Sequence, residues 1–173
     1  DIMLELSKLV PKLTMTTNGV LIHKHIDILK KANIRSINVS LDTLNEARFL
    51  ALTKRDQFQQ VMENINLLLR ENFHVKVNVV AMKGINDKEI NQFVAWTKHL
   101  PLHVRFIEFM PFSQNEWNKD RVFTFQQILE TIQEEYDIIK LQDELHDTTK
   151  KYQCIGHEGT FAIISTMTHP FCS

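Results

Sequence analysis

The stretch that decides the fold is residues 58–82, which read FQQVMENINLLLRENFHVKVNVVAM. From Phe58 to Leu69 its apolar residues recur at helical spacing, which predicts an amphipathic helix of about 15 residues. Residues 75–82 are rich in β-branched side chains and predict a strand. A helix that leads within a few residues into a strand is the repeating step of an α/β fold.

The same alternation continues on both sides of this stretch. Three further strands are predicted, at residues 12–17, 35–41 and 104–110, with helical patterns before and between them. Asn33 can end one of these helices in a left-handed conformation, and Asn86 or Asp87 can cap another. Strands that alternate with helices predict right-handed βαβ units and a parallel sheet, either barrel-like or doubly wound.

Beyond Pro111 the regular alternation of strands and helices ends. Thr124 and Gln127 form a capping box ahead of a helical pattern, and residues 151–154 and 160–165 read as antiparallel strands. Gln142 to Lys150 is polar and predicts either a loop or a family-variable insertion. The sequence therefore predicts two parts, residues 1–112 with the α/β pattern and residues 113–173 as a small α+β region, with the boundary near residues 111–120.

The amino-acid composition limits the classes of protein to which the chain can belong. The 173 residues are 43% hydrophobic and 24% charged with a net charge of −1, which gives no general attraction to nucleic acid or membranes. No apolar run approaches the roughly 20 residues of a membrane span, and we expect no basic leader. The two cysteines favour a reducing compartment, and the eight histidines lack metal-ligand spacing, so we expect them at the surface.

Polar residues recur at every second position within three of the predicted strands. Two of the sets are Thr14, Thr16, Asn18 and Asn38, Ser40, Asp42, and the third is Lys76 with Asn78. If these faces all point into a barrel, they line a hydrophilic cavity at the carboxyl ends of the strands, where α/β folds bind ligands. If some of the strands are at an edge, the same residues simply face water.

Individual residues allow the same two interpretations. Lys76 inside a sheet would need an anion such as a phosphate, whereas at an edge it could reach solvent. Arg105 and Glu108 point to opposite faces of the last α/β strand, and each could meet a ligand or form a structural ion pair. Met110, at the end of that strand, could pack on an adenine ring or fill the core.

Five segments carry a resemblance to a known family: residues 16–19 (TTNG), 37–44 (INVSLDTL), 75–80 (VKVNVV), 83–87 (KGIND) and 104–111 (VRFIEFMP). In order and spacing they resemble the successive strand motifs of the MoaA-type GTP 3′,8-cyclases, radical S-adenosylmethionine enzymes of molybdenum cofactor biosynthesis. The resemblance covers essentially the whole chain. It implies strands three to six of a six-stranded partial (βα) TIM-like barrel, followed by a small α+β region.

The resemblance also implies roles for particular residues. Thr16 and Lys76 fall where this family contacts GTP, and Ser40 and Met110 where it contacts S-adenosylmethionine. Residues that would support the site are Asn38, Asn78, Arg105 and Glu108. Cys172 matches the first of three cysteines that bind a C-terminal four-iron (4Fe-4S) cluster, whereas Cys154 matches no ligand and is expected to be structural.

The chain also departs from the family. The CxxxCxxC loop of the N-terminal 4Fe-4S cluster, the Gly-Gly-Glu-Pro segment and the cysteines that would follow Cys172 are absent, so we expect the isolated chain to be inactive. The alternative is a catalytically dead nucleotide-binding or scaffold form of the same fold, and another radical enzyme with a similar barrel is disfavoured. The resemblance implies cyclic pyranopterin monophosphate synthase as the next enzyme, a homodimeric parent, and a mitochondrial location in animals or a cytoplasmic one in bacteria.

Overall fold

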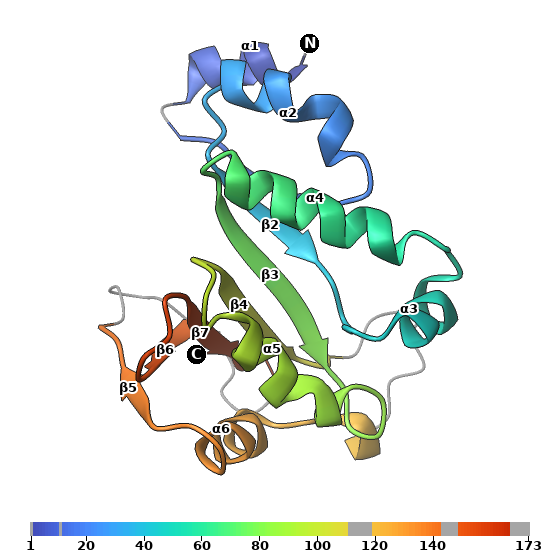
Figure 1. Ribbon diagram of the computed structural model, residues 1–173, viewed down its shortest axis with the longest axis vertical. Helices are drawn as coiled ribbons and strands as arrows, with labels where there is room; N and C mark the ends of the chain where they lie inside the picture. Colours follow the sequence, from blue (N-terminus) through green and yellow to red (C-terminus); the bar gives the residue numbers. More distant parts are fainter. Residues whose placement is uncertain (1, 11, 111–118, 143–148, 167–173) are drawn as a thin grey trace. The chain divides into compact units, whose positions relative to one another are not determined.

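The computed structural model describes residues 2–10, 12–110, 119–142 and 149–166. Figure 1 shows its helices and strands in chain order. They are α1 (Ile2–Leu9), β1 (Thr14–Thr17), α2 (Ile22–Lys31), β2 (Ser36–Ser40), α3 (Glu46–Thr53), α4 (Phe58–Arg70), β3 (His74–Ala81), η1 (Asp87–Glu89), α5 (Ile90–Trp96), β4 (His103–Glu108), η2 (Lys119–Arg121), α6 (Phe125–Gln133), β5 (Ile138–Lys140), β6 (Thr149–Cys154) and β7 (Thr160–Ile164). All the strands predicted from the sequence are confirmed, with ends that differ by one or two residues.

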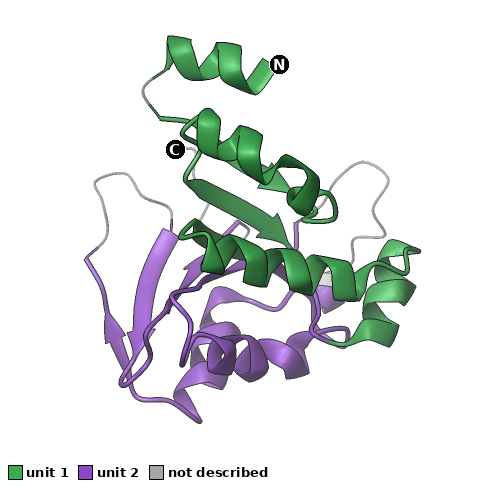
Figure 2. Cartoon of the chain, turned by 45° about the horizontal axis from the view of Figure 1, so that its top comes forward, with its two compact units in different colours: residues 1–41, 45–77 green, residues 42–44, 78–173 purple. Residues whose placement is uncertain are grey.

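The chain divides into two compact units, drawn green and purple in Figure 2. Unit 1 comprises residues 1–41 and 45–77, and unit 2 comprises residues 42–44 and 78–173. The strand order is β1-β2-β3-β4-β7-β6-β5, and β3 belongs to unit 1 in its first half and to unit 2 in its second. The two-part division predicted near residue 112 stays a prediction.

Unit 1 is built on a parallel strand pair covered by amphipathic helices. Thr14 to Thr17 of β1 pair in register with Ser36 to Val39 of β2. Helices α2 and α4 contact each other, and α4 buries the apolar stripe that the sequence predicted. Asn64 on α4 is also buried, and its amide nitrogen donates to the carbonyl oxygens of Gly19 and Val20 at 2.7 and 2.9 Å. Helix α4 therefore fixes the turn that follows β1.

Unit 2 combines parallel and antiparallel pairing. β4 pairs with β7 in parallel, β7 with β6 is antiparallel, as the sequence predicted for these two strands, and β6 with β5 is antiparallel as well. Phe93 of α5 and Phe106 of β4 are fully buried and pack edge to face with ring centroids 6.3 Å apart. Helix α6 begins with the predicted capping box of Thr124 and Gln127. No helix within the described residues is long and apolar enough to cross a membrane.

Some predictions need correction. Helix α3 and strand β5 were not foreseen, and β6 begins at Thr149, inside the stretch predicted to be a loop. Asn33 does take the expected left-handed conformation, with φ 52°. Asn86 precedes η1 without capping it, because its side chain hydrogen-bonds elsewhere.

His157 is buried, contrary to the expectation that all histidines lie at the surface. It lies in the turn between β6 and β7, where its Nδ1 is 3.0 Å from the hydroxyl of Thr97 and its ring meets that of Tyr136 edge to face. A turn residue was assumed to be solvated, but this turn packs against the end of α5.

Candidate functional site

The strands of the α/β part alternate strictly between a covered and an open face. In β2, β3 and β4 every second side chain is buried, and these include Ile37, Val39, Val75, Val77, Val79, Val104 and Phe106. The residues between them are half-buried or exposed, and they include the polar sets singled out in the sequence. The strands are therefore apolar on one face and largely polar on the other, which is why the polar period of two could be read directly from the sequence.

In unit 1 the polar face brings Thr16 and Asn38 together. The two residues are register partners on β1 and β2, and the Asn38 side-chain nitrogen donates to the Thr16 hydroxyl at 3.1 Å. The side-chain oxygen of Asn38 is buried and has no partner among the described residues. Because an unpaired buried acceptor costs free energy, this oxygen is suited to a donor group on a ligand.

The other two predicted site residues of unit 1 lie on neighbouring strands of the same sheet. Ser40 is exposed at the carboxyl end of β2, two residues beyond Asn38 and on the same strand face. Lys76 is half-buried on β3, between the covered residues Val75 and Val77. β3 lies between β2 and β4 in the strand order, so the interpretation of Lys76 as a residue of an edge strand is wrong, and its contact with a phosphate stays a prediction.

In unit 2 the predicted residues separate onto two faces. The Arg105 Nε donates to the side-chain oxygen of Asn78 at 2.8 Å on the half-exposed face. Glu108 lies on the opposite face, as the sequence predicted, and is fully buried, which was not predicted. Its carboxylate accepts from the backbone N–H of Phe125 at 2.6 Å and of Thr166 at 2.9 Å. The contacts of Glu108 thus join β4 to the start of α6 and to the residues after β7.

Met110 follows the end of β4 and is half-buried. Cys172 lies outside the described residues, so its predicted role as a cluster ligand is not tested.

Sequence reasoning missed a buried hydrogen-bond cluster at the carboxyl ends of β2 and β3. Residues 42–44 are held by side chains that follow β3, chiefly those of Asn86 and Glu89, both of which are buried. Asp42 was noted only for its place on the polar face of its strand. Its Oδ1 accepts from the Val80 N–H at 2.8 Å, and burial raises the pKa of its carboxyl group although that hydrogen bond lowers it. The sequence carries no clear signal for this cluster, because the burial of Asn86 and Glu89 depends on contacts with residues more than 40 positions earlier.

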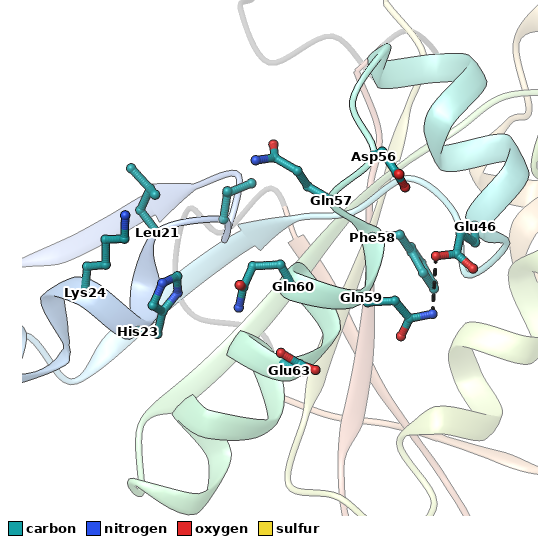
Figure 3. Close-up of a pocket in the computed structure, with 11 residues that line it drawn as sticks. Leu21, His23, Lys24, Glu46, Asp56, Gln57, Phe58, Gln59, Gln60 and Glu63 are labelled. Carbon is teal, nitrogen blue, oxygen red and sulfur yellow. Dashed lines mark hydrogen bonds between the residues drawn. The ribbon is translucent and has the colours of Figure 1, made fainter.

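A cavity of about 530 Å³ lies elsewhere in unit 1 and contains none of the predicted site residues. Its wall includes the residues that begin α2 and α4, and Figure 3 shows His23 and Lys24 on one side of it and Glu46 and Asp56 on the other. The lining carries both signs of charge, and Glu46 accepts a hydrogen bond from Gln59 at 3.4 Å. This cavity is distinct from the polar strand face.

The described residues do not fit an iron–sulfur cluster. Clusters of this kind are held by several cysteine thiolates, usually four. Within the described ranges Cys154 is a free, buried thiol on β6, and burial raises its pKa to about 11. No group of three or more histidine, cysteine, aspartate or glutamate side chains able to hold a metal occurs in this part of the chain. Cys154 therefore has the character of a core residue, as expected.

Comparison with known proteins shows the protein family to which the chain belongs. The family described as the radical SAM superfamily matches residues 1–97, more than half of the chain, and the family described as Molybdenum Cofactor Synthesis C matches residues 102–173. The chain belongs to the radical SAM superfamily. A crystal structure of a domain of pyruvate-formate lyase-activating enzyme from Bacteroides vulgatus has the same fold, with a TM-score of 0.59 over 78% of this chain and 83% of that domain at 11% identity. The α/β part is accordingly a partial TIM-like barrel of the radical SAM type.

The chain is also similar to individual known proteins. The chain is 39% identical to the mitochondrial GTP 3′,8-cyclase of Arabidopsis thaliana over its whole length, which is 45% of that protein. It is 36% identical to human molybdenum cofactor biosynthesis protein 1, with 99% of this chain and 28% of that protein covered. A bacterial GTP 3′,8-cyclase from Petrotoga mobilis is 36% identical over 93% of the chain and 50% of its own length. The chain thus spans between about a quarter and a half of these relatives.

Proposed function

We propose that the chain is the central part of a GTP 3′,8-cyclase, which converts GTP to (8S)-3′,8-cyclo-7,8-dihydroguanosine 5′-triphosphate in molybdenum cofactor biosynthesis. The observation that carries the proposal is the polar face of unit 1, where Thr16, Asn38, Ser40 and Lys76 lie on three successive strands. The names of the most similar relatives support the same activity.

On this face each residue has a chemical task. The Lys76 ammonium would neutralise a phosphate of GTP, and the Thr16 hydroxyl would hydrogen-bond the same substrate. The unpartnered Asn38 oxygen beside Thr16 is suited to a hydroxyl or amino group of the ligand. Ser40, exposed at the end of β2, would hydrogen-bond S-adenosylmethionine.

In unit 2, Met110 would pack on the adenine ring of S-adenosylmethionine. Arg105 and Asn78, already joined by a hydrogen bond, would support the polar face, whereas Glu108 would act through the backbone of α6.

Membership of the radical SAM superfamily implies S-adenosylmethionine and a 4Fe-4S cluster as cofactors. Such a cluster would supply the electron for radical chemistry on S-adenosylmethionine. The part of the chain that the structure describes contains no set of side chains that would hold such a cluster. The parent protein would carry two clusters and pass its product to cyclic pyranopterin monophosphate synthase. It would be mitochondrial in a plant or an animal and cytoplasmic in a bacterium.

The first test measures GTP binding by the full-length protein, reconstituted anaerobically with iron and sulfide. Replacing Lys76 with Met keeps most of the side-chain length and removes the charge. Losing one charge-assisted hydrogen bond costs about 1.5–3 kcal/mol, so we expect GTP affinity to fall about 10- to 100-fold. The matched control is Lys31→Met, on the exposed end of α2, which should leave GTP affinity unchanged. Equal affinities for the two variants would rule out this role of Lys76.

The alternative is a catalytically inactive nucleotide-binding or scaffold form of the same fold. Iron and sulfide content of the same reconstituted protein separates the two. Bound iron with turnover of GTP supports the cyclase, whereas GTP binding without iron supports the inactive form.

A further inference from the structure

The short segment Asp42–Leu44 is fixed at each of its three residues. The Asp42 side chain accepts from the Val80 N–H at 2.8 Å, and its carbonyl oxygen accepts from the Asn86 amide nitrogen at 2.7 Å. The Thr43 hydroxyl donates to both carboxylate oxygens of Glu89, at 2.9 and 2.8 Å, and the Leu44 N–H donates to Glu89 Oε2 at 2.7 Å. The segment is thereby bound into unit 2, although its neighbours in sequence belong to unit 1.

Asn86 and Glu89 give their side chains to this segment rather than to their own helices. Each lies at the N-cap position of the element that follows it, η1 or α5, yet neither makes a side-chain capping bond. Asn86 instead bonds to the carbonyls of Asp42 and Val80 and accepts from the Met82 N–H. A side-chain cap by a residue such as asparagine commonly contributes about 1 kcal/mol, and the orientation of the Asn86 side chain forgoes that contribution.

The segment lies at the carboxyl ends of β2 and β3, where a ligand is expected to bind. It begins two residues after Ser40, where the chain leaves the carboxyl end of β2, and Val80 lies near the same end of β3. Ligands of α/β proteins bind at the carboxyl ends of strands, and they need side chains held to a fraction of an ångström. The buried cluster therefore holds the chain from the second residue after Ser40 onward.

We propose that Thr43, Asn86 and Glu89 are positioning residues that hold the carboxyl end of β2 for binding of S-adenosylmethionine. This inference rests on the proposed function, because it takes Ser40 as a contact of that cofactor. None of the three residues needs to touch the cofactor itself.

The test compares two buried threonines of unit 2. Thr43→Val removes the hydroxyl that donates to Glu89 at nearly constant volume. Thr97→Val makes the same change at the far end of α5, where the hydroxyl donates to the Val94 carbonyl at 2.8 Å. Glu89, the partner of Thr43, and Thr97 lie at opposite ends of α5, whose seven residues span about 10 Å. Affinities for S-adenosylmethionine and for GTP are measured separately on each reconstituted full-length variant, together with the melting temperature.

We expect Thr43→Val to weaken S-adenosylmethionine binding about 5- to 20-fold, in keeping with the loss of one buried hydrogen bond, while GTP affinity changes less than about twofold. Thr43→Ser, which keeps the hydroxyl, should restore the affinity. Thr97→Val should lower the melting temperature without changing either affinity. If Thr43→Val proves too unstable to purify, Glu89→Gln tests the same hydrogen bonds.

Unchanged S-adenosylmethionine affinity in a folded Thr43→Val protein would overturn the inference and leave the proposed function standing. An equal loss of both affinities would also overturn it, because that pattern indicates general destabilisation. A wild-type protein that binds GTP but no S-adenosylmethionine would instead refute the proposed function, and the inference with it.

Discussion

Replacing Gly159 with alanine tests the packing between the start of β7 and the segment before β4. A Cβ at this position would lie 2.3 Å from the Leu102 carbonyl oxygen, 2.6 Å from the Leu100 carbonyl oxygen and 3.0 Å from the Leu102 nitrogen. All three atoms belong to the backbone, so no side chain can move aside to relieve the overlap. Gly159→Ala must therefore separate the two backbone segments.

The separation would break specific hydrogen bonds. The Gly159 N–H donates to the Thr97 carbonyl at 2.9 Å, and the Thr160 N–H donates to the Leu102 carbonyl at 3.0 Å. Overpacking costs about 1–3 kcal/mol and each weakened hydrogen bond about 1 kcal/mol, so we expect Gly159→Ala to lower the free energy of unfolding by about 2–4 kcal/mol. For a chain of this size that corresponds to a fall in melting temperature of roughly 4–16 °C.

Gly156 provides the matched control because it lies three residues away in the same turn. Its φ is +80°, and an added Cβ would meet nothing within 4 Å. Gly156→Ala therefore carries only the cost of left-handed backbone, about 1–2 kcal/mol. Calorimetry or chemical denaturation of both variants measures the difference. If Gly159→Ala is no less stable than Gly156→Ala, the close backbone approach at residues 100–102 is wrong.

Three further predictions follow from buried polar groups. Asn64→Leu should lower the free energy of unfolding by about 2–4 kcal/mol, because it leaves the carbonyls of Gly19 and Val20 without their donor, and urea denaturation against Asn66→Leu, at an exposed position of the same helix, measures the loss. Burial lowers the pKa of His157, so the folded state disfavours its protonation and stability should fall as the pH drops below about 6.5; a His157→Gln variant that keeps the same pH dependence in denaturation would contradict this. Burial raises the pKa of Asp42, so its charged form costs stability at neutral pH, and Asp42→Asn, which can still accept from the Val80 N–H, should be at least as stable as wild type at pH 7 and lose that advantage at low pH.

The sequence predicted the strands well because their apolar and polar residues alternate so regularly. Val75, Val77 and Val79 are all fully buried, and Lys76 and Asn78 between them are not. The opposite orientations of Arg105 and Glu108 follow from the same period of two and are confirmed. Local chemistry was also sufficient for the capping box at Thr124.

What the sequence could not predict depends on contacts between distant residues. Asn86 looked like a helix cap because asparagine commonly serves there, but its partners are Asp42 and Val80, and Asp42 lies 44 residues earlier. His157 looked like a surface residue because turns are usually solvated, yet this turn folds against Thr97, 60 residues away. The roles assigned to Thr16, Ser40, Lys76 and Met110 come from the family resemblance and stay predictions.

The regular alternation of β3 has a consequence for how this protein can change over evolution. Substitutions on its open face leave the buried valines in place. Inserting or deleting a single residue at the start of the strand itself, after His74, would shift every later side chain to the opposite face, because the side-chain period of a strand is two residues. Lys76 and Asn78 would then enter the interior, and Val75 and Val77 would leave it. We therefore expect natural variants of this strand to differ in residue type but not in length.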